Sequence, residues 1–166
     1  LLVYRESPGP VFYLQERTGR GGKPFKIIKI RSMRTDAEAQ SGAKWCTKDD
    51  SRRLKVGALM RKLNIDELPQ FWNVLKGEMS LVGPRPERPE LIQDFKSKIE
   101  YYNLRHTAKP GITGWAQIRY GYASSEEQAR EKLEYDLFYI KHMSVWLDFN
   151  IVLHTLTTII LRKGAR

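Results

Sequence analysis

The sequence predicts an α+β fold that is mostly helical and carries a small N-terminal β-hairpin. Two short runs rich in β-branched and aromatic residues lie near the N-terminus, on either side of a glycine-dense turn. From about residue 49 onward, apolar residues recur at helical spacing between capping and helix-ending residues. The 166 residues are enough for one hydrophobic core, so we expect a single domain over residues 1–166.

The expected hairpin pairs Val11–Gln15 with Phe25–Ile30. Between these strands, Arg17–Lys23 holds three glycines and three cations, which predicts a basic turn. The following stretch, Thr35–Thr47, is polar and poor in large apolar residues, which is typical of a surface loop.

Helices are expected over most of the remaining chain. Their expected ranges are residues 49–63, 66–76, 88–105, 124–141 and 145–161. Asp49–Ser51 can cap the first helix, and Gly77 ends the second. Ser124–Glu127 form a capping box for the fourth, and Ser144 can cap the last. Lys109–Gln117 lacks helical periodicity and is too rich in glycine for a strand, so we expect a structured loop there.

The last expected helix is rich in Ile, Leu, Val and Trp but is interrupted by Asp148, Asn150 and His154. Its length is marginal for crossing a bilayer. Two interpretations stay open: an amphipathic helix that lies in a membrane surface, anchored by Trp146, or an ordinary core helix.

Composition narrows the class of protein. With 41% hydrophobic and 29% charged residues, the chain is neither disordered nor a polytopic membrane protein. Residues 1–62 contain 15 Lys and Arg against 6 Asp and Glu, which gives them +9 of the formal net charge of +10. This basic part should face an anionic partner, such as nucleic acid, lipid headgroups or a phosphorylated substrate. Cys46 is the single cysteine, which excludes an internal disulfide.

The adjacent acids Asp66 and Glu67 and the rigid segment Gly83–Pro86 are candidates for phosphate chemistry. An Asp before a helical run is most often an N-cap, but a helix N-terminus also keeps a nucleophilic carboxylate ionised. Glu67 could hold a divalent cation, and Arg85, fixed between two prolines, could present its guanidinium to a phosphate. A loop with a solvated arginine is the alternative. Asp148, an acid in an apolar helix, needs a partner or a cation.

Seven segments, spread in order along nearly the whole chain, form a recognisable set. They are Gly9–Tyr13, Gly22–Phe25, Lys29–Met33, Asp66–Gln70, Asn73–Gly77, Met79–Pro86 and Lys109–Gln117. Together they resemble the bacterial sugar transferase family, the monotopic phosphoglycosyl transferases that begin polysaccharide assembly on a polyprenol carrier.

The resemblance implies an enzyme that transfers a sugar 1-phosphate from a nucleotide sugar, usually a UDP-sugar, to undecaprenyl phosphate and releases UMP. Asp66 matches the family's nucleophile, which implies an aspartyl-phosphosugar intermediate. Glu67 matches the residue that holds Mg²⁺, the cofactor implied. Arg85 matches the arginine of the Pro-Arg-Pro turn, and Lys29 and Arg61 match basic positions near the site. Asp148 also aligns with a family acid.

Two further features follow from the resemblance. Relatives carry a re-entrant membrane helix before the start of this chain, which implies a place on the cytoplasmic face of the bacterial inner membrane. After Trp115–Gln117 many members continue with an Asn-Gly-Arg-like turn, whereas here the chain continues with Ile118–Tyr122. Arg119 is the candidate replacement for that arginine in substrate binding. This branch resembles the members that act in exopolysaccharide synthesis.

A nucleic-acid-binding module is the competing hypothesis. The basic charge and the interleaved Tyr and Trp residues permit it, but it leaves the Asp66–Glu67 pair unexplained. We therefore expect a nucleotide sugar, a polyprenol phosphate and a membrane as partners, and no nucleic acid. The sequence does not name the sugar and leaves open whether the protein forms a homo-oligomer.

Overall fold

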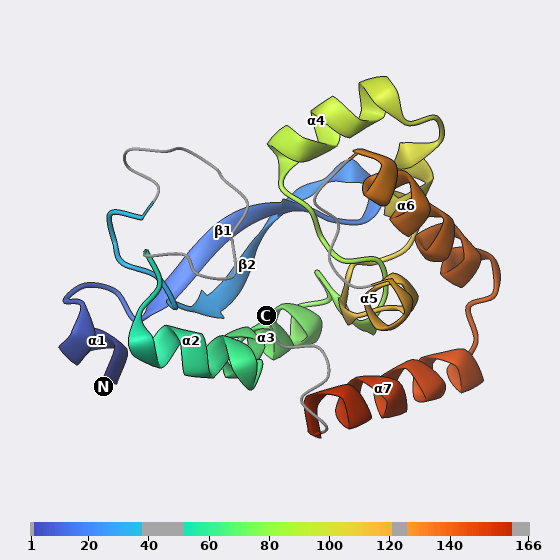
Figure 1. The fold of residues 1–166 in the computed structure, drawn as a ribbon. Coiled ribbons are helices and arrows are strands. Elements are labelled where there is room, and N and C mark those ends of the chain that lie inside the picture. The colour runs from blue at the N-terminus through green and yellow to red at the C-terminus, as the bar shows by residue number, and fades with distance from the viewer. Residues whose placement is uncertain (1, 38–51, 121–125, 161–166) are drawn as a thin grey trace.

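The computed structural model describes residues 2–37, 52–120 and 126–160 (Figure 1). The helices are α1 (Leu2–Glu6), α2 (Lys55–Lys62), α3 (Gln70–Leu75), α4 (Pro89–Lys98), α5 (Trp115–Arg119), α6 (Glu126–Lys141) and α7 (Val145–Ile160). The strands are β1 (Phe12–Thr18), β2 (Pro24–Ile30), β3 (Ser80–Val82) and β4 (Gly111–Thr113). Short 3-10 helices cover Arg20–Gly22, Ile65–Glu67 and Tyr102–Thr107. The expected α+β class is confirmed.

The N-terminal hairpin is confirmed and is longer than expected at its turn. β1 and β2 pair antiparallel from Phe12 opposite Ile30 to Thr18 opposite Pro24. Figure 1 shows this long hairpin crossing the centre of the molecule, with α2 and α3 below it and α4 above its far end. The hairpin therefore connects the two ends of the fold.

Asn73 of α3 binds the outer edge of β2. Its side-chain carbonyl accepts the Ile28 amide at 3.1 Å, and its side-chain amide donates to the Lys26 carbonyl at 2.8 Å. A single buried side chain thus makes the two hydrogen bonds that a third strand would make. This contact fixes α3, and the segment before it, against the hairpin.

The α2 helix begins later than expected, at Lys55. The carboxylate of Glu6 in α1 accepts the Lys55 amide at 2.5 Å and the Val56 amide at 3.0 Å, so an acid from another helix caps it. The expected caps at 49–51 lie outside the described residues, as does most of the expected loop at 35–47.

The expected helix at residues 66–76 is two elements. Pro69 separates the 3-10 helix Ile65–Glu67 from α3, because proline lacks an amide hydrogen and its ring clashes with the preceding helical turn. The expected end of the second element is confirmed, since Gly77 adopts a left-handed conformation with φ of 78° directly after the Lys76 cap.

The expected helix at residues 88–105 is also broken. Ile99 is extended and Tyr101 has a positive φ of 60°, which ends α4 and starts the 3-10 helix Tyr102–Thr107. The apolar spacing of this range was still informative, because its apolar residues pack with α6 in one core. This cluster contains Ile92, Phe95, Ile99, Tyr102, Ala129 and Leu133.

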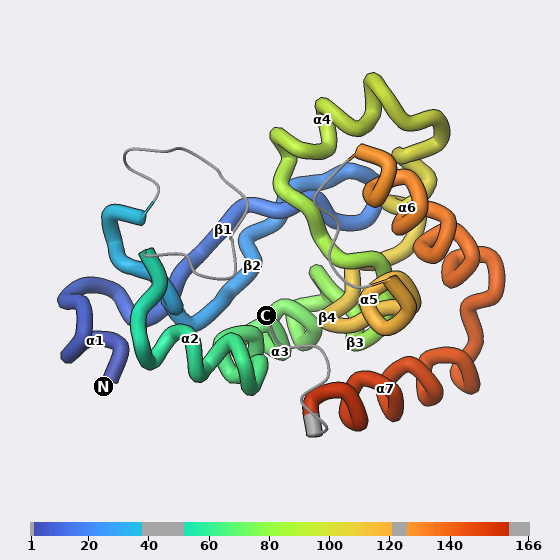
Figure 2. Tube along the Cα trace, in the orientation of Figure 1, coloured from blue at the N-terminus to red at the C-terminus, as the bar shows by residue number. Residues whose placement is uncertain are grey.

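The expectation that Lys109–Gln117 forms a structured loop, with neither a strand nor a helix, was wrong. The segment forms β4, which pairs in parallel with β3, followed by the short helix α5 (Figure 2). Its glycines serve the strand instead of breaking it. A Cβ atom on Gly83 would lie 2.3 Å from the Lys109 carbonyl oxygen, and one on Gly111 would lie 2.1 Å from the Gly83 nitrogen. The two backbones approach so closely that a side chain cannot fit between them.

The C-terminal helices α6 and α7 form as expected. Ser144 accepts the Leu147 amide at 3.2 Å and so caps α7, whereas the expected cap Ser124 lies outside the described residues. Buried Ile151 packs α7 against Val82 and Tyr139. Among the described residues, no helix is long and apolar enough to span a bilayer.

Candidate active site

The acid pair lies on the 3-10 helix Ile65–Glu67, between α2 and α3. Asn64 starts this turn in the left-handed region with φ of 54°, a conformation that asparagine tolerates better than most residues. Asp66 is buried in this turn and is only 6% exposed. The Asp66 side chain does not cap α3, because no side chain makes a capping hydrogen bond at the start of that helix.

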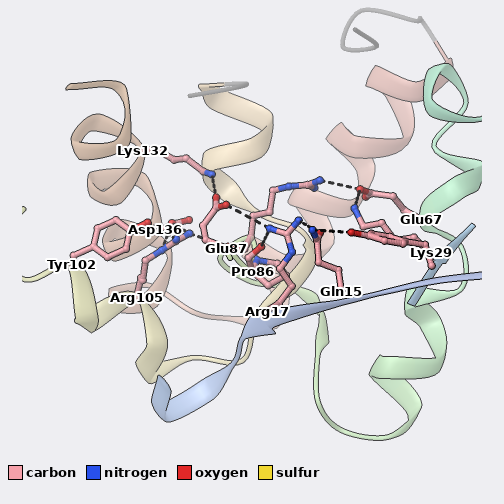
Figure 3. Close-up of polar contacts among 12 residues, drawn as sticks. Gln15, Arg17, Lys29, Glu67, Pro86, Glu87, Tyr102, Arg105, Lys132 and Asp136 are labelled. Carbon is pink, nitrogen blue, oxygen red and sulfur yellow. Dashed lines mark hydrogen bonds and ion pairs between the residues drawn. The ribbon is translucent and has the colours of Figure 1, made fainter. Parts of the chain in front are cut away.

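Glu67 is the centre of an ion cluster that we call the Glu67 cluster, made of Glu67, Lys29 and Arg85. Lys29 Nζ of β2 donates to Glu67 Oε1 at 2.8 Å, and Arg85 Nη2 donates to the same oxygen at 2.9 Å. Figure 3 shows Lys29 and Glu67 facing each other. Two predicted phosphate-binding cations are thus held together by one carboxylate.

The two neighbouring acids have opposite electrostatics. Burial raises the pKa of Asp66, and the charge of Glu67 raises it further, against the smaller effects of Lys29 and Arg61. Burial alone would also raise the pKa of Glu67, but the charges and hydrogen bonds of Arg85 and Lys29 hold that pKa far below its usual range. Glu67 is therefore firmly ionised, whereas the ionised form of Asp66 is costly in the folded protein.

Lys29 and Arg61 both act on Asp66 through their charges. Burial lowers the pKa of Lys29, and the repulsion of Arg85 adds to this, while Glu67 partly restores it. Arg61 of α2 is oriented by Ser32, whose Oγ accepts from Arg61 Nε at 2.8 Å. The structure therefore brings three of the predicted cations, Lys29, Arg61 and Arg85, into one electrostatic unit around Asp66 and Glu67.

The family assignment rests on almost the whole chain. The family model described as bacterial sugar transferase matches residues 1–162. The chain belongs to the bacterial sugar transferase family.

Several curated members of this family are similar to the chain. It is 50% identical to the UDP-N-acetylgalactosamine-undecaprenyl-phosphate N-acetylgalactosaminephosphotransferase of Aeromonas hydrophila, over 100% of this chain and 39% of that protein. It is 45% identical to the UDP-glucose:undecaprenyl-phosphate glucose-1-phosphate transferase of Escherichia coli (strain K12), over 99% of this chain and 36% of that protein. The chain spans well under half the length of both relatives.

A third relative is of more similar length. The exopolysaccharide production protein PSS of Rhizobium leguminosarum bv. phaseoli is 39% identical, over 99% of this chain and 85% of that protein. All three alignments cover essentially the whole described fold.

Two predicted site residues have their contacts elsewhere. Arg119 is an exposed residue of α5, and its guanidinium lies over the face of Trp115, 4.4 Å from the ring centroid. The Asp148 carboxylate on α7 accepts a hydrogen bond from the Tyr139 hydroxyl at 2.8 Å. Asp148 therefore has the partner that an acid in an apolar helix requires, and it links α7 to α6. The substrate-binding roles of both residues stay predictions.

The donor set at the acid pair suits a divalent ion only together with a substrate. The described residues hold no group of three or more His, Cys, Asp or Glu that could bind a metal by themselves. Mg²⁺ commonly uses one or two carboxylates, with substrate phosphates and waters completing its octahedron. Asp66 and ionised Glu67 provide that minimum, so the residues fit an ion that arrives with a diphosphate.

Sequence reasoning missed a second ion cluster, on the other side of the Arg85 turn. We call it the Arg105 network; it contains Arg17, Glu87, Arg105, Lys132 and Asp136 (Figure 3). One signal for it was present in the sequence. Asp136 lies on the same helical face as Leu133, and a charge on an apolar face requires a buried partner.

Proposed function

We propose that this protein transfers a sugar 1-phosphate from a UDP-sugar to undecaprenyl phosphate and releases UMP. The observation that carries the proposal is the placement of buried Asp66 beside the Glu67 cluster, where Lys29, Arg61 and Arg85 gather around two adjacent carboxylates. A diphosphate anion needs such cations before a carboxylate can approach its phosphorus. The family membership and the activities for which the relatives are named support the same chemistry.

In the first step, an Asp66 carboxylate oxygen attacks the phosphorus that carries the sugar. The bond from this phosphorus to the bridging oxygen of the diphosphate breaks, and UMP leaves with the electron pair. The product is an aspartyl-phosphosugar, an acyl phosphate on Asp66. The raised pKa of Asp66 favours this step, because a costly carboxylate loses its charge when it forms the ester.

In the second step, a phosphate oxygen of undecaprenyl phosphate attacks the same phosphorus. The bond to the Asp66 oxygen breaks, which regenerates the carboxylate and leaves undecaprenyl-diphosphosugar. The two steps share one site, so the expected kinetics are ping-pong.

The cations of the site have separate roles in this proposal. The Arg85 guanidinium binds the phosphate oxygens of the donor. Lys29 and Arg61 offset the negative charge that builds up beside Asp66. Glu67 holds Arg85 and Lys29 in place and is the residue that would hold Mg²⁺ against the donor diphosphate. The bound ion would supply charge neutralisation on the diphosphate oxygens.

The names of the relatives suggest candidate donor substrates and a candidate pathway. The Aeromonas hydrophila protein is named for UDP-N-acetylgalactosamine and the Escherichia coli protein for UDP-glucose, so these two donors are the first to try. The Rhizobium relative is named for exopolysaccharide production, and we propose the first membrane step of exopolysaccharide or related glycoconjugate synthesis.

We place the protein at the cytoplasmic face of the bacterial inner membrane, as a monotopic protein. Large apolar side chains are exposed on the α2–α3 segment and on α7, which lie along the lower side of the molecule in Figure 1. They are Leu59, Leu63, Ile65, Leu68, Phe71, Trp72 and Leu75, and Val145, Trp146, Phe149, Leu153 and Leu156. Asp66 lies in the middle of the first group, where the phosphate of a lipid acceptor would meet it.

The chemistry is tested on the full-length protein in detergent, with Mg²⁺, undecaprenyl phosphate and a panel of UDP-sugars. UMP release is expected with at least one donor and should fall when the ion is chelated. Without the lipid acceptor, intact mass should rise by one sugar phosphate in the wild type and stay unchanged in Asp66→Asn. A mass increase in Asp66→Asn would refute the assignment of the nucleophile.

The membrane placement is tested by flotation with vesicles that contain anionic lipid. Replacing Trp72 or Trp146 with Glu should weaken binding, because each charge would have to enter the interface. Leu104→Glu, at an exposed leucine of the 3-10 helix that packs on α6, serves as the matched control. Equal loss of binding in the control would argue against the proposed face.

A further inference from the structure

The turn that carries Arg85 has every backbone carbonyl from residue 84 to residue 87 hydrogen-bonded to another part of the fold. The four donors in order are the Gly111 amide at 3.0 Å, Arg105 Nη2 at 3.0 Å, Arg17 Nη1 at 3.1 Å and the Thr18 amide at 3.0 Å. The two outer bonds are ordinary backbone pairs. The two inner bonds, at Arg85 and Pro86, come from guanidinium groups of the Arg105 network.

Arg105 holds the carbonyl of Arg85 itself. Its Nε and Nη2 donate to Asp136 Oδ2 at 3.1 and 2.7 Å, and Nη1 donates to the Tyr102 hydroxyl at 2.9 Å. The Arg105 and Asp136 side chains are 3% and 2% exposed. The planar, buried guanidinium thus has three partners. Asp136 and Tyr102 hold its orientation, and this orientation fixes the contact with the Arg85 carbonyl.

The Pro86 carbonyl is held in a similar way. Arg17 of β1 reaches it, and Glu87, the next residue along, pairs with Arg17 and with Lys132 of α6. Figure 3 shows Arg17 beside Pro86, on the side of the Arg105 network that faces the Glu67 cluster. The backbone of the turn is therefore tied to the hairpin on one side and to α6 on the other.

The Arg85 side chain has the opposite character. Its guanidinium reaches Glu67 and the side chain as a whole is 29% exposed, so it lies at the open end of an otherwise fixed segment. A guanidinium on a fixed backbone can meet a phosphate without an ordering cost at the moment of binding. The direction in which the Arg85 guanidinium points then depends on the groups that hold residues 84–87.

We propose that Arg105, oriented by Asp136, is a positioning residue for the reaction: it sets the placement of the Arg85 guanidinium by holding the Arg85 carbonyl. This inference rests on the proposed function for its kinetic consequence. Its structural consequence, a turn fixed by Arg105, holds whatever the substrate is.

The experiment compares wild type, Arg105→Lys, Arg85→Ala and the double variant of the full-length protein in detergent. A lysine reaches one or two acceptors and lacks the planar fork, so the turn should loosen. Arg105→Lys should lower kcat/KM for UMP release by about tenfold to a hundredfold, as expected for a misplaced binding group. In the Arg85→Ala background the same change should cost less than about threefold, because the residue through which it acts is gone.

Hydrogen–deuterium exchange provides a readout that does not depend on activity. In Arg105→Lys, the peptide that contains residues 83–88 should exchange faster, while peptides of α7 stay as in the wild type. If no UDP-sugar yields UMP with the wild type, the proposed function fails, and the exchange result alone decides the inference. Unchanged exchange at residues 83–88 would overturn it.

Tyr102→Phe is the matched control. It removes another hydrogen bond of Arg105 but leaves the bond to the Arg85 carbonyl, so it should lower the melting temperature without changing UMP release or exchange at residues 83–88. Equal loss of activity in this control, or a fully additive loss in the Arg85→Ala background, would show that the network has a general structural role instead.

A second variant covers the case in which Arg105→Lys does not fold. Asp136→Asn keeps an acceptor oxygen for Arg105 and removes its charge, so it should give faster exchange at residues 83–88 and a smaller loss of kcat/KM. Wild-type exchange in this variant would also overturn the inference.

Discussion

The Glu67 cluster and the Arg105 network lie on opposite sides of one turn and differ in how far they exclude water. In the Arg105 network the central pair is 3% and 2% exposed. In the Glu67 cluster, Lys29 and Glu67 are both 17% exposed and Arg85 is 29% exposed. The Arg105–Asp136 pair is closed to solvent, whereas the Glu67 cluster can still receive a ligand.

The two clusters also differ in how completely their charged groups are paired. Arg105 has an anion, a hydroxyl and a carbonyl as partners, which is what a buried guanidinium requires. At the other cluster two cations share one oxygen of Glu67, and the neighbouring Asp66 is costly to ionise. Local conflict of this kind concentrates at functional sites, which distinguishes a working site from a structural one.

The sharpest test of this difference is Asp66→Asn. UMP release should fall by more than about 10³-fold, as when other catalytic nucleophiles are removed. The same variant should be more stable at pH 7, because a carboxyl whose pKa is raised on folding contributes stability that is lost as pH rises above its unfolded value. Thermal melts at pH 7 and near pH 4 check this, since the gain should vanish at the lower pH. A loss of stability at pH 7 would mean that Lys29 and Arg61 outweigh burial.

The Arg105 network should fail in the opposite way. Asp136→Ala leaves the Arg105 guanidinium buried without its anion, and we expect a loss of about 3–5 kcal/mol in the free energy of unfolding. Denaturant unfolding of the variant measures it. A loss below about 1 kcal/mol would remove the contrast between the two clusters.

Glu67→Gln should have an intermediate effect on stability. Removing the anion shared by Lys29 and Arg85 should cost about 1.5–3 kcal/mol at pH 7, the usual contribution of hydrogen bonds to charged groups. The pKa of Glu67 is lowered on folding, so its contribution is present above the unfolded value of 4.5 and is lost as pH falls below it. Wild type and variant should therefore converge in acid, and a constant difference between pH 7 and pH 3 would contradict the ion-pair explanation.

An exposed ion pair on α4 should give the smallest effect in this comparison. Lys98 bonds to Asp94 one helical turn earlier on the surface of α4. Lys98→Ala should leave the melting temperature and UMP release unchanged, because solvent screens such pairs. A clear loss in this variant would show that exposure is a poor guide to the importance of charge here.

The fold was predictable where a pattern is local. Hairpin spacing, the Ser144 cap and the apolar period of α6 and α7 all depend on neighbours in sequence, and all were confirmed. The errors arose where a distant segment decides the conformation. Gly111 and its neighbours become strand β4 because Gly83, 28 positions earlier in the chain, admits a close backbone contact, and no local signal encodes that pairing.

The candidate site follows the same rule. The acid pair and the Pro-Arg-Pro turn were visible in the sequence, and the structure brings Glu67, Arg85 and Lys29 into contact. Arg105 was missed because its role depends on a carbonyl 20 positions away and on an acid of α6, neither of which has a motif. Sequence thus identified side chains with a chemical signature but not those that hold a backbone.

The contact of Asn73 with β2 also bears on how copies of this protein can meet. Since its amide group already takes the Ile28 amide and the Lys26 carbonyl, a strand from another molecule cannot add at that rim while α3 stays docked. Growth of an intermolecular sheet from the β2 edge would first require α3 to detach. One buried asparagine thereby closes one edge of a two-stranded ribbon to strand addition.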